Sequence, residues 1–212
     1  MTQKRVICYV DGFNLYHAID NLNKPHLKWL DLRSLVEKNY VNSHAEKLVA
    51  IKYFSALATH RPSVGRHRTY IRAIQSTGVE VILGKFGTDP KLCRRCNYNW
   101  DERREKKSDV RLACTMVVDA YTDQMDTAIL ISNDTDFVPP IEVLCGLPNP
   151  KTVRALVPPG MNINMDLSNA ADTNNPSAQI TRDILEQNLF NRILRDEFKK
   201  IIRRPPEYDP PK

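Results

Sequence analysis

Four aspartates have the type and spacing that metal-assisted hydrolysis needs. Asp11 and the pair Asp134 and Asp136 each follow an apolar run, and Asp109 begins a segment with helical spacing. Carboxylates a few Å apart raise one another's pKa values, so a cluster of them is unfavourable without a cation. Mg²⁺ or Mn²⁺ removes that conflict because carboxylate oxygens are ligands that such hard ions prefer. An ion of this kind can polarise a phosphodiester and generate hydroxide from bound water.

Each aspartate also has an ordinary structural explanation, which the sequence leaves open. Asp134 could cap a following helix, Asp109 could complement a helix dipole, and Asp11 could be a turn residue before Gly12. Their joint placement at strand ends favours a site more than any single residue does. By contrast, we expect a cluster of acids further along the chain to be a solvated helix end: Asp119, Asp123 and Asp126.

Three neighbouring polar residues are candidates for binding substrate. Asn14 lies one helical turn beyond Asp11 and could orient that carboxylate or bind a phosphate. Ser132 and Asn133 immediately precede Asp134 on the same tight turn.

The charge of the chain favours a polyanionic partner. Lys and Arg number 31 against 25 Asp and Glu, for a net charge of +6, and the sequence pI is about 9.1. One basic segment interleaves Tyr98 and Trp100 with bases, which suits stacking on unpaired RNA bases while the charges hold phosphates; its candidate arginines are Arg94, Arg95, Arg103 and Arg104. A solvated loop is the alternative. A second basic surface is expected over residues 61–72, which contain no acid.

The cysteines allow one weak metal hypothesis. Cys93 and Cys96 have the spacing of half a zinc site. No second Cys or His pair accompanies them, so plain reduced thiols are the favoured interpretation, and a redox or intermolecular role is a further alternative. Five scattered cysteines favour a reducing compartment, and we expect a cytoplasmic location. No apolar run approaches the length of a membrane span, so no membrane partner is expected.

Strand-like runs alternate with helical segments, which predicts an α/β fold with a parallel sheet flanked by helices. The expected strands are residues 6–10, 48–57, 79–83, 127–132 and 152–157, and the expected helices are 14–22, 31–40, 64–76, 109–121 and 135–144. Residues 84–107 fit neither period and are expected to be an insertion. Beyond residue 160 we expect an edge strand near 179–181, a helix over 184–193 and an extended or frayed Pro-rich end.

Ligands of open parallel sheets bind beyond the carboxyl ends of the strands. If the first and fourth expected strands are neighbours, the four aspartates converge on one crevice.

Three segments resemble the NYN domain, in its LabA-like branch of the PIN-like nuclease superfamily. They are Val10-Asp-Gly-Phe-Asn-Leu15, Lys107-Ser-Asp-Val-Arg-Leu-Ala113 and Ala128-Ile-Leu-Ile-Ser-Asn-Asp-Thr-Asp-Phe-Val-Pro139. The resemblance implies a three-layer Rossmann-like fold and metal-dependent RNA cleavage, with the four aspartates binding Mg²⁺ or Mn²⁺ and Asn14 in support. It runs from about residue 5 to 172.

The resulting expectation is a nuclease domain over residues 1–175, with its basic, Cys-containing insertion at about 84–107. Residues 176–212 are expected to be an extension that packs on the same domain. The expected function is a metal-dependent ribonuclease acting on single-stranded or structured RNA, and a homodimer is compatible with it. The alternative is a non-catalytic RNA-binding regulatory module. An aspartate-nucleophile phosphatase is disfavoured because position 13, where its second acid would stand, is Phe.

Overall fold

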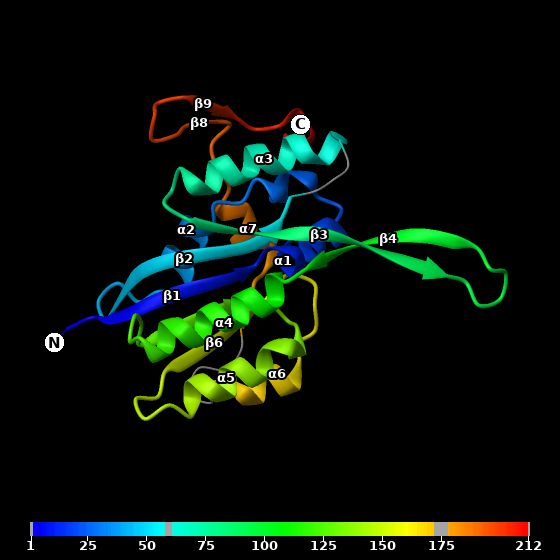
Figure 1. The fold of residues 1–212 in the computed structure, drawn as a ribbon. Coiled ribbons are helices and arrows are strands. Elements are labelled where there is room, and N and C mark those ends of the chain that lie inside the picture. The colour runs from blue at the N-terminus through cyan, green and yellow to red at the C-terminus, as the bar shows by residue number, and fades with distance from the viewer. Residues whose placement is uncertain (1, 58–60, 172–177, 212) are drawn as a thin grey trace.

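The computed structural model describes residues 2–57, 61–171 and 178–211; for residues 61–62, 85–89 and 101–106 it describes the backbone alone. One seven-stranded sheet has the spatial order β4-β3-β2-β1-β5-β6-β7. Six of its strands are parallel, and β4 runs antiparallel to β3. The strand order therefore reverses at β1, which pairs with both β2 and β5 (Figure 1).

The strands and helices follow most of the expected segments. The strands are β1 Lys4–Asp11, β2 Glu46–Ala56, β3 Glu80–Leu92, β4 Asn99–Lys106, β5 Thr127–Ile131, β6 Thr152–Val157, β7 Ala178–Gln179, β8 Ile193–Arg195 and β9 Ile201–Arg203. The α-helices are α1 Gly12–Asn21, α2 Leu32–Asn39, α3 Arg61–Gln75, α4 Ser108–Tyr121, α5 Val138–Cys145, α6 Met165–Ala170 and α7 Arg182–Gln187. Three short 3₁₀ turns are η1 Pro25–Lys28, η2 Thr135–Phe137 and η3 Pro206–Tyr208.

Helices cover both faces of the sheet, which gives the three layers expected from the sequence. In Figure 1, α4, α5 and α6 lie on one side of the strands, and α2, α3 and α7 lie on the other. Alternate residues of β1 pack into two separate cores: Val6, Cys8 and Val10 into one, Ile7 and Tyr9 into the other. A strand buried on both faces has an uninterrupted apolar sequence, and this is why the run in β1 was recognisable.

The insertion at 84–107 is a β-hairpin, a structure that the sequence did not predict. β3 pairs with β2 as far as Gly84 and then continues past the sheet. From Lys85 onward it pairs with β4, with Leu92 opposite Asn99 near the tip. The hairpin projects well beyond the rest of the molecule (Figure 1). The described side chains of the hairpin, at residues 90–100, are exposed or half-buried. Residues that face no core need no alternation of apolar and polar types, so the usual strand pattern is missing there.

The C-terminal region differs from expectation in two places. The helix predicted over 184–193 is shorter, because α7 stops at Gln187 and Leu189 pairs with Leu30 in an isolated bridge. Beyond it, β8 and β9 form a small hairpin. The expected frayed end is wrong up to residue 208, since Tyr208 is buried in the core that contains Trp29.

Within the described ranges, no helix is both long enough and apolar enough to cross a bilayer.

Candidate functional site

The sheet brings the ends of β1 and β5 together, because these two strands pair directly from Val6 opposite Thr127 to Val10 opposite Ile131. Asp11 is the last residue of β1, and Asp134 follows β5 by three residues. This edge is the reversal point of the strand order, where open α/β sheets bind their ligands. The condition set by the sequence, that the first and fourth expected strands be neighbours, is met.

Both aspartates also cap helices, as the structural alternative proposed for Asp134; for Asp11 the alternative was a turn residue. The Asp11 Oδ1 accepts a hydrogen bond from the Asn14 backbone N–H at 3.0 Å, which makes Asp11 the N-cap of α1. The Asp134 Oδ1 accepts from the Asp136 backbone N–H at 3.0 Å and caps η2. Capping occupies one oxygen of each carboxylate and fixes its direction, so a cap and a ligand-binding role are compatible.

Ser132 and Asn14 tie the two strand ends to each other. The Ser132 hydroxyl donates to the Asp11 Oδ2 at 3.0 Å and accepts from the Asp134 backbone N–H at 3.2 Å. The Asn14 Oδ1 accepts from the Asn133 backbone N–H at 3.2 Å. Ser132 is fully buried. The hydrogen bonds of these residues therefore fix the positions of the carboxylates.

The Asn133 side chain forms hydrogen bonds with the loop that precedes α6. Its Nδ2 donates to the Asn162 carbonyl at 2.8 Å, and its Oδ1 accepts from the Asn164 backbone N–H at 3.1 Å. Asn164 in turn caps α6. The amide of Asn133 thus joins the loop after β5 to the loop before α6.

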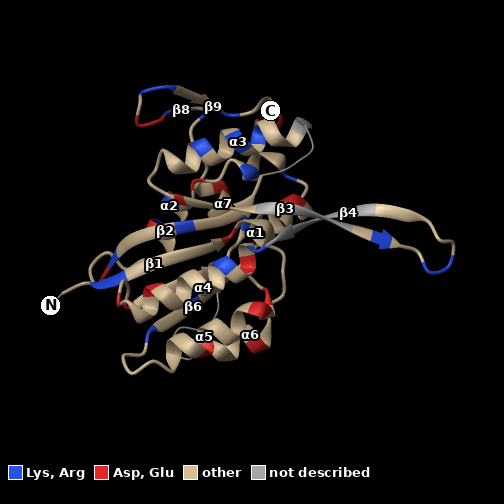
Figure 2. Ribbon diagram, viewed as in Figure 1, with Lys and Arg blue, Asp and Glu red and all other residues tan. Residues whose placement is uncertain are grey.

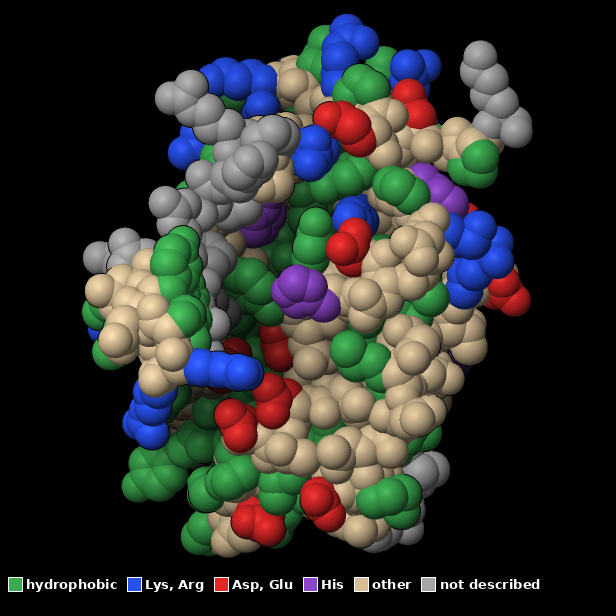
Figure 3. All heavy atoms as spheres, turned by 90° about the vertical axis from the view of Figure 1, so that its right-hand side faces the viewer, with side chains coloured by type: hydrophobic (Ala, Val, Ile, Leu, Met, Phe, Trp, Pro, Cys, Tyr) green, Lys and Arg blue, Asp and Glu red, His purple; other side chains and the backbone are tan. Residues whose placement is uncertain are grey.

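The carboxylates repel one another. Burial is the main cause that raises the pKa of Asp11 to about 6, and the charges of Asp109 and Asp134 raise it further against the lowering effect of its two hydrogen bonds. Burial also raises the pKa of Asp109, followed by the charges of Asp134 and Asp136. Asp109 and Asp134 therefore lie within electrostatic reach of Asp11 and of each other, and Asp136 lies within reach of Asp109. Figure 3 shows acidic side chains gathered on this face.

The donor set suits a hard divalent cation in kind. Carboxylate oxygens are the ligands that such an ion prefers. Burial, and after it the charges of Asp109 and Asp134, make the ionised form of Asp11 unfavourable, and a bound cation would offset that effect. In the part of the chain with described side chains, no three His, Cys, Asp or Glu residues are gathered closely enough to hold a metal ion. The acids thus lie at the same end of the sheet, but no three of these four described side chains are close enough together to share one ion.

The basic hairpin projects from the same edge of the sheet. Figure 2 shows basic residues at its far tip and acidic residues at the ends of α4 and the loops beside it. Arg94 and Arg95 are exposed at that tip, and the rings of Tyr98 and Trp100 stack 6.2 Å apart. The backbones of Arg103 and Arg104 lie in β4, and their side chains fall outside the described residues.

Cys93 and Cys96 form a compact turn at the hairpin tip. The backbone N–H groups of Arg95 and Cys96 donate to the Cys93 sulfur, and these bonds are the main cause that lowers the pKa of that thiol. Asn97 follows with a left-handed φ of 53°. Both thiols are free, and the other three cysteines lie in the body of the molecule. The turn thus presents a pair of sulfur ligands.

The expected second basic surface is partly neutralised. Arg66 pairs with Glu207 at 2.9 Å, and Arg72 pairs with Asp196 at 3.0 Å. Both acids come from the C-terminal region. These ion pairs could not be predicted from the sequence, because more than 120 residues separate each arginine from its partner.

Asp119 was wrongly expected to be solvated. It is 7% exposed, and its Oδ2 accepts from the Tyr9 hydroxyl and from the Lys52 ammonium, each at 2.7 Å. Asp119 shares a helix face with the buried Leu112 and Met116. That spacing of seven and three residues was the signal that could have revealed its burial.

Taken together, the strand order and the acidic crevice define the chain as a three-layer α/β protein of the PIN-like type. The family model of the NYN domain matches residues 5–177. The chain belongs to the NYN domain family, which lies in a nuclease-like superfamily.

Two individual proteins are similar to this chain. 6-Hydroxy-3-succinoylpyridine 3-monooxygenase HspA of Pseudomonas putida is 30% identical, in a match that covers 66% of this chain and 55% of that protein. The chain thus spans about half the length of this curated relative. A crystal structure of a protein of unknown function from Vibrio parahaemolyticus superposes with a TM-score of 0.55 at 18% identity, covering 89% of this chain and 97% of that one. That likeness concerns the fold alone.

Proposed function

We propose that this protein is a metal-dependent ribonuclease that hydrolyses phosphodiester bonds in RNA. The observation that supports the proposal is the pairing of β1 with β5, which brings Asp11 and Asp134 to the reversal point of the sheet. The charge of Asp109 acts on Asp11, and that of Asp136 acts on Asp109. Membership of the NYN family supports it.

The four aspartates would hold Mg²⁺ or Mn²⁺, which supplies Lewis acidity toward the phosphate and the leaving oxygen. Asp11 is placed most firmly, because two hydrogen bonds and burial restrict its side chain. Ser132 and Asn14 act as positioning residues that keep the ends of β1 and β5 in register. Water attacks phosphorus directly and the leaving oxygen takes up a proton, so no covalent intermediate with the chain forms.

RNA is the favoured polymer because a cation-rich hairpin extends from the acidic edge. Arg94 and Arg95 would hold phosphates at a distance from the cleavage point, while Tyr98 and Trp100 offer stacked rings to unpaired bases. An acidic crevice by itself repels a polyanion. A separate basic arm on the same side counters that repulsion.

The test is cleavage of a labelled single-stranded RNA by the full chain, with Mg²⁺ or Mn²⁺ and with EDTA. We expect metal-dependent cleavage that falls to background in Asp11→Asn and in Asp134→Asn. Asp183→Asn, which changes an exposed acid in the first turn of α7, is the matched control and should cleave normally.

The same preparation tests the alternative, a non-catalytic RNA-binding module. RNA binding in the presence of metal, with no cleavage by the wild-type chain, would favour that module. Cleavage that persists equally in Asp11→Asn would show that the acidic crevice is not the active site.

A further inference from the structure

A pocket of about 230 Å³ opens beside Asp11, on the β2 side of β1. Gly12 and Phe13 form part of its wall, and they follow Asp11 directly in the chain. The remaining walls come from α1, η1, the end of β2, α3 and η3. Figure 3 shows a hollow with hydrophobic walls next to the acidic side chains, with histidine at its margin. The pocket and the acidic crevice are therefore neighbouring parts of one surface.

The pocket is lined by aromatic rings. Tyr53 and Tyr70 meet edge to face with their centroids 6.3 Å apart, and Tyr208 closes the wall from the C-terminal region. Tyr16 is 41% exposed, and the Lys28 ammonium lies 4.7 Å from the centre of its ring. The Lys28 ammonium is already paired with Asp20, so the aromatic rings are what the pocket offers to a ligand. Flat apolar walls of this kind suit a planar heterocycle.

A few polar groups interrupt the apolar lining. Ser55, Ser63 and His67 contribute hydroxyl and imidazole groups to the walls. Burial lowers the pKa of His67, so its ring is neutral near pH 7. Apolar pockets with a small number of polar groups select ligands by shape and by the hydrogen bonds along one edge.

Close packing fixes the pocket to the acidic site. A Cβ atom on Gly12 would lie 2.6 Å from the Tyr53 ring and 2.6 Å from the Phe54 carbonyl oxygen. Tyr53 is therefore in contact with the first residue of α1, whose N-cap is Asp11. A ligand in the pocket and a phosphate at the carboxylates would be held at a set separation.

We propose that this pocket binds an unpaired nucleobase of the nucleotide that flanks the cleaved phosphate. The inference rests on the proposed function and names its substrate class, RNA whose bases are free to leave a stack. Tyr16 forms the stacking wall at the mouth, and the buried rings form the floor. A base in a duplex is paired and stacked, so duplex RNA is a poor substrate for this protein.

The test uses a set of short single-stranded RNAs in which one nucleotide at a time lacks its base. Binding is measured in EDTA and cleavage in Mn²⁺, both with the full wild-type chain. We expect one abasic position, adjacent to the cleaved bond, to weaken binding about tenfold, because that RNA loses the stacking of a base on an aromatic ring. Annealing the complementary strand should suppress cleavage.

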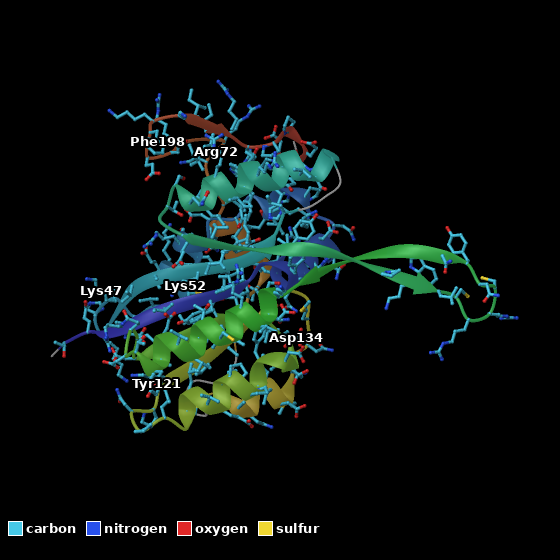
Figure 4. All side chains as sticks on the ribbon, in the orientation of Figure 1. Lys47, Lys52, Arg72, Tyr121, Asp134 and Phe198 are labelled. Atoms are coloured by element: carbon cyan, nitrogen blue, oxygen red, sulfur yellow. The ribbon has the colours of Figure 1, made fainter. Side chains whose placement is uncertain are left out.

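Two variants and a control connect that effect to the pocket. Tyr16→Ala removes the stacking wall and Ser63→Leu fills the pocket. Each variant should therefore bind the RNA that lacks the sensitive base as tightly as it binds intact RNA. Tyr121→Ala removes a tyrosine that is 80% exposed at the far end of α4 and should behave as wild type. Figure 4 shows that Tyr121 and Asp134 lie toward opposite ends of the strands.

The outcomes separate this inference from the proposed function. Equal binding and cleavage of intact RNA and of every abasic RNA would overturn the base pocket and leave the ribonuclease standing. Loss of the abasic effect in Tyr121→Ala as well as in Tyr16→Ala would also overturn it. Absence of both RNA cleavage and RNA binding would overturn the proposed function itself.

Discussion

Replacing Asp11 with Asn should stabilise this protein while removing its activity. The carboxylate is 6% exposed, and burial is the chief cause that raises its pKa from 3.8 to about 6, with Asp109 and Asp134 adding to it. Asn is an equally good N-cap and can keep hydrogen bonds to Asn14 and Ser132. The variant therefore removes the unfavourable charge with little loss of contacts.

The size of the effect follows from linkage. A folded-state pKa above the unfolded value means that the folded chain keeps a proton that the unfolded chain releases between about pH 4 and pH 6. The contribution of Asp11 to stability is thus fully present below pH 4 and is lost as the pH rises through 6. At about 1.4 kcal/mol for each pH unit, the loss is about 3 kcal/mol at neutral pH. For a chain of this length, that corresponds to roughly 6–12 °C in Tm.

Thermal unfolding in EDTA between pH 4 and pH 8 measures this effect. We expect Asp11→Asn and wild type to unfold at similar temperatures at pH 4 and to separate as the pH rises, with the variant more stable. Asp183→Asn should show no such separation. A variant that is less stable than wild type at pH 7.5, or a difference that is the same at pH 4, would refute the reasoning.

The effect of added Mn²⁺ on thermal stability is an independent test of the charge at Asp11. An ion that binds only the folded chain at a hundred times its Kd adds about 2.7 kcal/mol of stability. The Tm of wild type should therefore rise with Mn²⁺, and that of Asp11→Asn should rise much less. An equal rise in both proteins would place the ion elsewhere.

Three further predictions concern other parts of the chain. Asp119→Ala leaves the Lys52 ammonium buried without its partner and should cost about 3–5 kcal/mol in urea unfolding, whereas an unchanged midpoint would contradict the buried pair. Gly12→Ala overpacks the start of α1 and should cost about 1–3 kcal/mol by the same measurement. If the tip cysteines bind zinc, elemental analysis of reduced protein should find it, and Cys93→Ser with Cys96→Ser should remove it; metal-free wild type would support plain thiols.

Several features of the fold could be predicted because local sequence reports local burial. The continuous apolar runs of β1 and β5 revealed strands covered on both faces, since only such strands avoid polar positions. The helical spacing after Asp109 gave α4 almost to the residue. The positions of Asp11, Asp134 and Asp136 after apolar runs, and of Asp109 at the start of a helical segment, were likewise visible.

The hairpin at β3 and β4 escaped prediction for the opposite reason. Its described side chains beyond Gly84, at residues 90–100, belong to neither hydrophobic core, so burial imposes no pattern on them. Asp119 lies on α4 and its partner Lys52 on β2, 67 residues away, so the helical spacing could indicate burial of Asp119 but not the ion pair that accompanies it. In each case the deciding contact, or its absence, was not local.

The sequence by itself determined which residues form buried strands, that Asp11, Asp134 and Asp136 stand at or after the ends of two of them, and that Asp109 begins a helix. Only the tertiary structure decided that β1 and β5 are neighbours, which places those aspartates at one edge, and that α1, β2 and α3 enclose an aromatic pocket beside Asp11. The physical reason is that periodicity in a chain records how each residue meets solvent. Which strands pair depends on the packing of the whole sheet and its helices, and no short stretch of sequence contains that information.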